Sequence, residues 1–201
     1  MKQAALIQAK ERLERARDAL KRMDQATTFS SFEKPWADFL HASNGIYSKL
    51  EQGCKGCQAS QGWFGRKKHD RKKDQLLSYL HHARNTDEHG IGGTTLQYME
   101  IKILNDKVQN IRTTIDADGN SVLTPIGEGG EIEMIKRYTA LKAVTDSRYG
   151  DTFLPPTEHL GKSLSDPTNQ KALVNALEIA RLGLAYLDGL FIEATKLPQR
   201  S

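Results

Sequence analysis

Apolar residues recur at helical spacing through the N-terminal part of the chain. In residues 3 to 26 they keep a strict heptad spacing, with arginine and glutamate on the other faces, which predicts an amphipathic helix. A second helix is predicted from about residue 30 to 52, where Ser30 and Glu33 have the spacing of a capping box. A third helix should begin near Asp74. Its expected buried positions are Leu76, Leu77, Leu80 and Ala83.

The segments around the third predicted helix lack this period. Residues 53 to 73 are glycine-rich and basic, so we expect a loop that reaches solvent. Residues 94 to 144 contain short apolar runs separated by turn residues, which predicts an antiparallel sheet of three or four strands. Asp116–Asn120 fits a hairpin turn better than a calcium-binding loop, because its glycine comes too early and the final glutamate is missing. Residues 145 to 165 are expected to form a long connection, from which His159 could approach a cleft.

The last helix is expected from about residue 167 to 196, with Asp166 and Pro167 as its N-cap and first helical residue. Its apolar stripe consists of Leu173, Ala176, Leu177, Ala180, Leu184, Leu187, Phe191 and Ala194. None of the helices can bury its stripe alone, so the N-terminal helices should pack against the last one.

The predicted fold class is therefore mainly α, in a single domain spanning residues 1 to 201. It is a four-helix bundle with an antiparallel β-sheet insertion between the third and the last long helix. The helical core covers about residues 3–90 and 167–196, the insertion about 94–144, and the connection 145–165.

The composition is that of an ordinary globular protein, with 38% hydrophobic and 27% charged residues. The N-terminal segment carries a charge every few residues and has no apolar stretch of the length that a signal peptide or a membrane span needs. The chain has two cysteines, too few for a disulfide framework. We therefore expect a cytoplasmic protein with no membrane partner.

Positive charge is concentrated in one short run. The net charge of +4 is modest, but six of the 29 lysine and arginine side chains fall between residues 66 and 73. An exposed run of this kind attracts phosphate, although it is equally typical of a solvated surface. These candidate substrate-binding residues are Arg66, Lys67, Lys68, Arg71, Lys72 and Lys73.

The chain offers little for a metal or a cofactor. Cys54 and Cys57 have the spacing of a zinc-ligand pair, with His69 as a third candidate, but a second cysteine pair is missing. Ordinary thiols or a transient disulfide fit this pair better. The sequence contains no phosphate-binding P-loop, dinucleotide-binding glycine motif or metalloprotease motif. We predict neither a metal nor a cofactor.

The third predicted helix ends in the string RNTDEH, which contains Arg84, Asn85 and, five positions after the arginine, His89. This segment resembles the HEPN (higher eukaryotes and prokaryotes nucleotide-binding) family. The ribonuclease members of that family carry an arginine, a polar residue that is often asparagine, three variable residues and a histidine after an apolar helix. The resemblance covers the helical frame and this motif, and the predicted β insertion departs from the minimal four-helix pattern.

The resemblance implies a metal-independent endoribonuclease that acts as a toxin or a phage-defence component. It also implies a homodimer whose two motifs form one cleft and, in some relatives, a nucleotidyltransferase-like antitoxin. The alternative is a non-catalytic HEPN-like module that binds a nucleotide or a protein. The structural alternative for Arg84 and His89 is that they only complement the dipole at the helix end. A third functional interpretation is a zinc-dependent nucleic-acid binder, which would require stoichiometric zinc in the purified protein.

The residue types suit RNA cleavage, in which the 2′-hydroxyl attacks the adjacent phosphate. His89 can transfer the proton, since histidine titrates near neutral pH, and Arg84 can hold the phosphate oxygens with its fork of donors. Asn85 can hold the substrate or orient His89. The secondary candidates for substrate contact are His81 and His82, about one turn earlier, although at least one of them can equally be a packed histidine or a polar surface residue. Asp87 and Glu88 lie between Arg84 and His89 and can tune the basicity of the histidine, but acidic residues near a helix end are equally at home in solvent.

Overall fold

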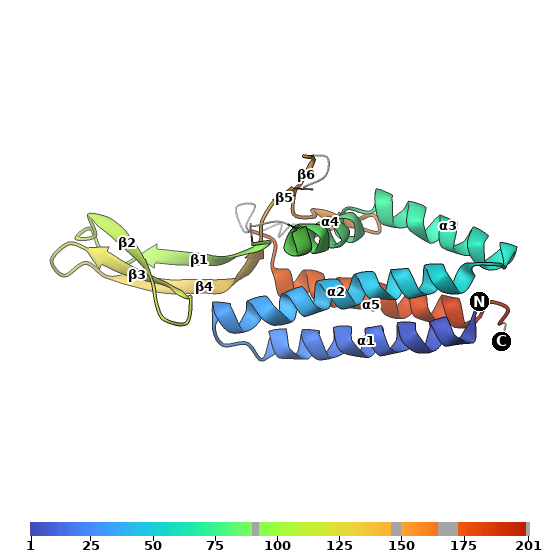
Figure 1. Cartoon of the computed structure of the whole chain (residues 1–201). Helices are drawn as coiled ribbons and strands as arrows, with labels where there is room; N and C mark the ends of the chain where they lie inside the picture. Colours follow the sequence, from blue (N-terminus) through green and yellow to red (C-terminus); the bar gives the residue numbers. More distant parts are fainter. Residues whose placement is uncertain (90–92, 146–149, 165–172, 200–201) are drawn as a thin grey trace.

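A computed structural model describes residues 1–89, 93–145, 150–164 and 173–199, without the side chain of His89. Its described helices are α1 (Gln3–Asp24), α2 (Phe29–Cys54), α3 (Gln58–Lys73), α4 (Gln75–His89) and α5 (Ala176–Thr195). Its strands are β1 (Thr95–Ile103), β2 (Asn110–Ile115), β3 (Ser121–Ile126), β4 (Ile132–Leu141), β5 (Val144–Thr145), β6 (Thr152–Phe153), β7 (Glu158–His159) and β8 (Lys162–Ser163). In Figure 1, α1, α2 and α5 run side by side, and α3 and α4 lie on the side of α2 that is away from α1. The long strands extend beyond the end opposite the two termini.

The predicted fold class is wrong. The described residues form five helices and several small antiparallel sheets, so the protein is a mixed α/β structure and not a four-helix bundle with one inserted sheet. The prediction that α1, α2 and α5 pack together is confirmed, since each contacts the other two. The predicted opening of the last helix at Asp166 and Pro167 lies outside the described residues, and α5 is capped by Asn175, which accepts from the backbone N–H groups of Leu177 and Glu178.

The additional helix is α3, which occupies most of the segment predicted to be a loop. Lysine, arginine and glutamine favour helices, and a glycine in a helix costs only about 1 kcal/mol. Trp63 and Phe64 are buried and anchor the helix, with the Phe64 ring edge-on to Tyr47 of α2. These two aromatic residues outweigh the glycines, so the segment is helical.

The predicted sheet of three or four strands is also wrong. Among the described residues, β1 pairs with β4 and β2 pairs with β3, each as a separate two-stranded antiparallel sheet. The predicted connection contains two further short pairs, β5 with β6 and β7 with β8. Most residues of β2 and β3 are exposed, so no buried face fixes a larger sheet.

The predicted hairpin turn at Asp116–Asn120 is confirmed, and it docks onto the N-terminus of α2. The N–H and the hydroxyl of Ser30 donate to the Asp118 carbonyl at 3.3 and 2.7 Å, and the N–H of Phe29 donates to Asn120 Oδ1 at 2.9 Å. Gly119 has a φ of +75°, and a Cβ there would collide with the Ser30 hydroxyl. The β2–β3 hairpin is therefore fixed to the helices by its tip.

The helices bury the apolar residues that the sequence pattern selects. All the predicted positions Leu76, Leu77, Leu80 and Ala83 of α4 are buried. Trp36 of α2 donates from Nε1 to the Thr94 hydroxyl at 2.8 Å, and the Tyr79 hydroxyl donates to the Lys142 carbonyl at 2.7 Å. These hydrogen bonds join the start of β1 and the end of β4 to the helical core. Across the described residues, no helix combines the length and the apolar character that crossing a membrane requires.

Candidate functional site

Arg84 follows the buried Leu80 of α4 by one helical turn, so it lies at the edge of the buried stripe. The Arg84 side chain is only 22% exposed and forms an ion pair through Nη2 with Glu88 Oε2 at 2.5 Å. Its Nη1 donates to Asn85 Oδ1 at 3.3 Å. Two predicted residues, Arg84 and Asn85, are thus brought together, and Glu88 contacts the arginine. His89 is the last residue of α4, and its side chain lies outside the described residues.

Arg84 lines an open pocket of about 850 Å³ that α1 and α2 otherwise form, hereafter the α1–α2–α4 pocket. Gly45 of α2 lets Arg12 of α1 lie across it, because a Cβ at Gly45 would be only 3.2 Å from Arg12 Cδ. The charged and titratable side chains that line the pocket are Arg12, Glu14, Arg15, Asp18, Arg22, Asp38, His41, Lys49 and Arg84.

The acidic side chains of this pocket are engaged with arginines. Arg22 contacts both Asp18 and Asp38 at 2.9 Å, and its pKa is raised, mainly by the hydrogen bond with Asp38. Glu14 is held by Arg17 at 2.6 Å. Each of these carboxylates therefore has a cation beside it and contributes little negative charge to the pocket as a whole.

Three basic side chains of the pocket, those of Arg12, Arg15 and Lys49, form no hydrogen bond or ion pair within the described ranges. Because Arg84 is paired with Glu88, it is these three side chains that give the α1–α2–α4 pocket an excess of positive charge. Such a pocket suits a phosphate group or another anion.

His41 of α2 adds a titratable group to the same pocket. Its Nε2 lies 3.2 Å from Asp87 Oδ2 of α4, and the two side chains are 44% and 30% exposed. The sequence predicts that Asp87 tunes His89, but the side chain that it contacts here is His41. The pair joins α2 to α4 at the rim of the pocket.

The secondary candidates His81 and His82 are not part of the pocket lining. The His82 ring stacks on Phe153 of β6, with centroids 3.4 Å apart and planes within 8°. The His81 ring lies edge-on to His82 at 5.1 Å. Both residues are half-buried. The stacking places His82 against the β5–β6 pair, and the His81 ring packs on His82. Neither histidine is among the residues that line the pocket of Arg84.

The basic run of residues 66–73 lies on α3, and none of its residues lines the α1–α2–α4 pocket. Lys67 forms an ion pair with Glu193 at 2.9 Å, and Lys68 with Glu51 at 2.8 Å. The Arg71 guanidinium lies 4.4 Å from the centre of the Tyr47 ring. The remaining members, Arg66, Lys72 and Lys73, are exposed. The structure thus separates this run from Arg84.

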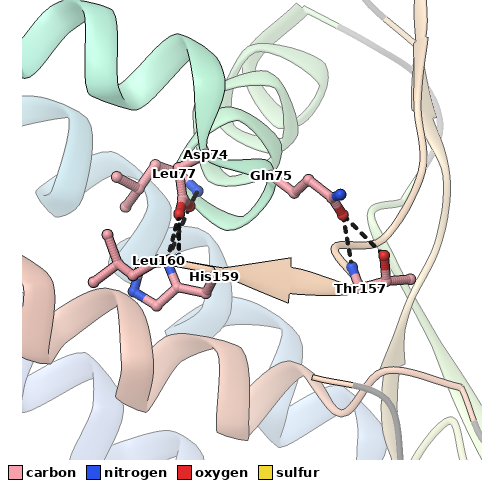
Figure 2. A network of polar contacts seen from close by, with 6 residues as sticks. All are labelled: Asp74, Gln75, Leu77, Thr157, His159 and Leu160. Carbon is pink, nitrogen blue, oxygen red and sulfur yellow. Dashed lines mark hydrogen bonds and ion pairs between the residues drawn. The ribbon is translucent and has the colours of Figure 1, made fainter. Parts of the chain in front are cut away.

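A second histidine–carboxylate pair joins α4 to the connection. His159 Nδ1 lies 2.9 Å from Asp74 Oδ1, and the backbone N–H groups of Leu77 and Leu160 donate to the Asp74 carboxylate at 2.9 and 2.8 Å (Figure 2). The side chains of His159 and Asp74 are only 8% and 9% exposed. His159 therefore does not approach the pocket, because its side chain is buried against the N-terminus of α4. We assign the His159–Asp74 pair a structural role.

The pair Cys54 and Cys57 lacks the features of a metal site in the part of the chain that the structure describes. Cys54 and Cys57 are not joined by a disulfide, and burial raises the pKa of the Cys54 thiol, which disfavours the thiolate that metals bind. Cys57 Sγ accepts from the Ser60 hydroxyl at 3.4 Å. Among the residues that the structure describes, no three histidine, cysteine or acidic side chains are grouped as a metal site would group them.

The residues of α1 and α2 that line the pocket were not identified as candidates from the sequence. The signal is weak but present: Arg12 and Arg15 are three apart on α1, and His41, Gly45 and Lys49 recur every four positions on α2. Such spacings place side chains on one helix face. Only the packing of the two helices shows that both faces line the same pocket.

Comparison of the chain with protein-family models, curated proteins and solved structures gives no match. The resemblance to HEPN ribonucleases therefore rests on the RNTDEH motif and on the helical segment that carries it.

Proposed function

We propose that this chain is a metal-independent endoribonuclease in which Arg84, Asn85 and His89 act on a phosphodiester of RNA. The observation that carries the proposal is that Arg84 lines an open, positively charged pocket of about 850 Å³. An arginine that only complemented a helix dipole would not need a pocket of that volume beside it. The volume lies in the range of about 300–1,000 Å³ that small-ligand sites occupy.

Arg84 suits a phosphate that gains charge during the reaction. Its two terminal nitrogens each carry two N–H groups, of which Asn85 and Glu88 engage one each. The remaining N–H groups can bind phosphate oxygens, and the charge on these oxygens grows as the 2′-oxygen attacks. Because the guanidinium is held by Asn85 and Glu88, its orientation is set before the substrate binds.

His89 completes the proposed reaction by proton transfer, as its position at the end of the motif implies. Cleavage by the 2′-hydroxyl requires no metal and no added water, and it leaves a 2′,3′-cyclic phosphate and a 5′-hydroxyl. The homodimer, the nucleotidyltransferase-like antitoxin and the role as a toxin or in phage defence belong to the same proposal. They rest on the resemblance to HEPN proteins alone.

The proposal is tested by incubating the purified protein with single-stranded RNA in EDTA. We expect cleavage that leaves 2′,3′-cyclic phosphate ends, no cleavage of the matching DNA, and loss of activity in His89→Ala without loss of the folded state. The proposal fails if RNA stays intact or if His89→Ala cleaves as fast as the wild type. Tight RNA or nucleotide binding without cleavage by the wild type would instead support the non-catalytic module.

The unengaged cations of the pocket lead to a prediction about salt dependence. Changing Arg15 and Lys49 together to glutamine removes two positive charges, and each RNA phosphate that is no longer neutralised should reduce the slope of log affinity against log salt by about 0.7. Fluorescence anisotropy with a 2′-deoxy-substituted, uncleavable RNA measures this slope. The matched control is Lys72→Gln with Lys73→Gln, the same charge change on α3. A larger effect from the control pair would place the RNA along α3 and outside the pocket.

A further inference from the structure

We propose that His41 is a second catalytic residue, which takes the proton from the attacking 2′-hydroxyl. This inference rests on the proposed function, because it assigns a step of that reaction. Cleavage of a phosphodiester by the 2′-hydroxyl needs two proton transfers, one from the attacking oxygen and one to the leaving oxygen. The RNTDEH motif supplies one histidine for these transfers.

The placement of His41 meets the first requirement of a general base, which is access to the substrate. Among the described residues that line the α1–α2–α4 pocket it is the only histidine, and its side chain is 44% exposed. Arg84 lines the same pocket from α4. A phosphate bound at Arg84 therefore shares its pocket with the His41 ring.

Asp87 determines which nitrogen of His41 can accept a proton. A carboxylate only accepts hydrogen bonds, so the Nε2 atom, 3.2 Å from Asp87 Oδ2, carries the hydrogen. The other nitrogen, Nδ1, then has the lone pair. Once Nδ1 takes a proton, the charge of Asp87 stabilises the imidazolium, as an acidic partner does in other histidine–carboxylate pairs.

The other carboxylates of the pocket that His41 lines are paired with arginines. The charged groups that line the same pocket as His41 are Arg84 on α4, Asp38 and Lys49 on α2, and Arg12, Glu14, Arg15, Asp18 and Arg22 on α1. Glu14 is held by Arg17. Asp18 and Asp38 both contact Arg22. This leaves Asp87 as the carboxylate in contact with the imidazole.

The proposed step balances without a further reactant. The 2′-oxygen forms a bond to phosphorus while its proton moves to His41 Nδ1. The bond between phosphorus and the 5′-oxygen breaks, and this oxygen takes a proton from the imidazolium of His89. Phosphorus is neither oxidised nor reduced.

The test compares His41→Asn, Asp87→Asn and the wild type in the RNA-cleavage assay over a range of pH. We expect His41→Asn to lower kcat by about 10²-fold, the lower end of what general acid–base catalysis contributes. We also expect the rise of kcat with pH on the acidic side to disappear, because the base that must lose its proton is gone. Asp87→Asn should give a smaller loss. His69→Asn, an exposed histidine of α3, is the matched control and should behave as the wild type.

Binding of the uncleavable RNA separates proton transfer from a structural role. Affinity and thermal unfolding of His41→Asn should stay at wild-type values. The inference is overturned if the wild type cleaves RNA and His41→Asn keeps both its rate and its acidic limb, and equally if this variant loses only affinity. In both cases the proposed ribonuclease stands. If the wild type cleaves no RNA at all, the proposed function itself has failed, and the assignment of His41 falls with it.

Discussion

Replacing Asp74 with alanine is expected to lower the free energy of unfolding by about 3–5 kcal/mol, the cost of removing one partner from a buried ion pair. The carboxylate accepts from two backbone N–H groups and faces His159, and both side chains are more than nine-tenths buried. Its contact with Leu77 is the one that an N-cap makes with the third residue of a helix, here α4. Urea unfolding monitored by circular dichroism measures the loss.

This contribution should depend on pH with a defined sign. Burial alone would raise the pKa of Asp74, but the N–H groups of Leu160 and Leu77 and the His159 ring together lower it below its usual value of 3.8. A carboxyl with a lowered folded-state pKa contributes stability that is present above the unfolded-state pKa and is lost as the pH falls through the folded-state pKa. The difference between wild type and Asp74→Asn should therefore be constant above about pH 5 and shrink below about pH 4.

A control variant and a double-mutant cycle separate the contribution of the buried Asp74–His159 pair from that of an exposed carboxylate. Asp70→Ala removes an exposed carboxylate one turn earlier, and it should change stability by less than about 0.5 kcal/mol. A double-mutant cycle with His159→Ala should show coupling, because the two side chains are in contact. An Asp74→Ala protein as stable as the Asp70→Ala control would contradict the role assigned to this pair.

The helices α1, α2, α4 and α5 could be predicted because each has one apolar stripe at helical spacing. Their ends were less predictable. The capping box of α2 uses Thr28 and Ser31, two residues before the predicted Ser30 and Glu33, and Pro35 lies within the helix. Helix α3 was missed because its stability comes from Trp63 and Phe64, which are buried only when the neighbouring helices are in place. Tertiary packing thus overrides the local signal of glycine and charge.

Residues 94 to 144 were predicted to contain strands, and β1 to β4 lie within that range, but their pairing was not predicted. Strand patterns show which residues are extended and leave the partner open unless one face is buried. Here β1 pairs with β4 across the whole β2–β3 hairpin, with a register shift between Glu100 and Ile101. The hydrogen bonds that anchor the insertion, Trp36 with Thr94 and Tyr79 with Lys142, join residues far apart in sequence.

The candidate site was only partly predictable, because some of its residues are neighbours in sequence and others are brought together by packing. Arg84 and Asn85 are local in sequence, and the motif identifies them without any knowledge of packing. The pocket beside Arg84 is made by α1 and α2, so His41, Arg12 and Lys49 enter only when these helices are packed. The basic run on α3 has the strongest charge signal in the sequence, but it lies on a different part of the surface.

Replacing Arg84 with alanine is expected to lower kcat for RNA cleavage by about 10²–10³-fold, the loss seen when one preorganised donor to a developing negative charge is removed. The phosphorane carries more charge on its oxygens than the bound substrate does, so the loss should fall mainly on kcat and less on KM. Arg84→Lys keeps the charge but not the planar fork that Asn85 and Glu88 hold in place. It should therefore recover only part of the rate. Single-turnover cleavage in EDTA measures both variants.

The matched control for this prediction is Arg15→Lys, the same substitution at an exposed, unengaged arginine of the same pocket. A point charge should suffice at Arg15, because the proposal assigns contact with the reacting phosphate to Arg84 and leaves Arg15 to attract the RNA backbone. Its kcat should be that of the wild type. If Arg84→Lys and Arg15→Lys are equally active, Arg84 attracts RNA but does not stabilise the transition state. A rise in KM alone in Arg84→Ala would lead to the same conclusion, and the pocket would then be a binding surface whose reacting groups lie elsewhere.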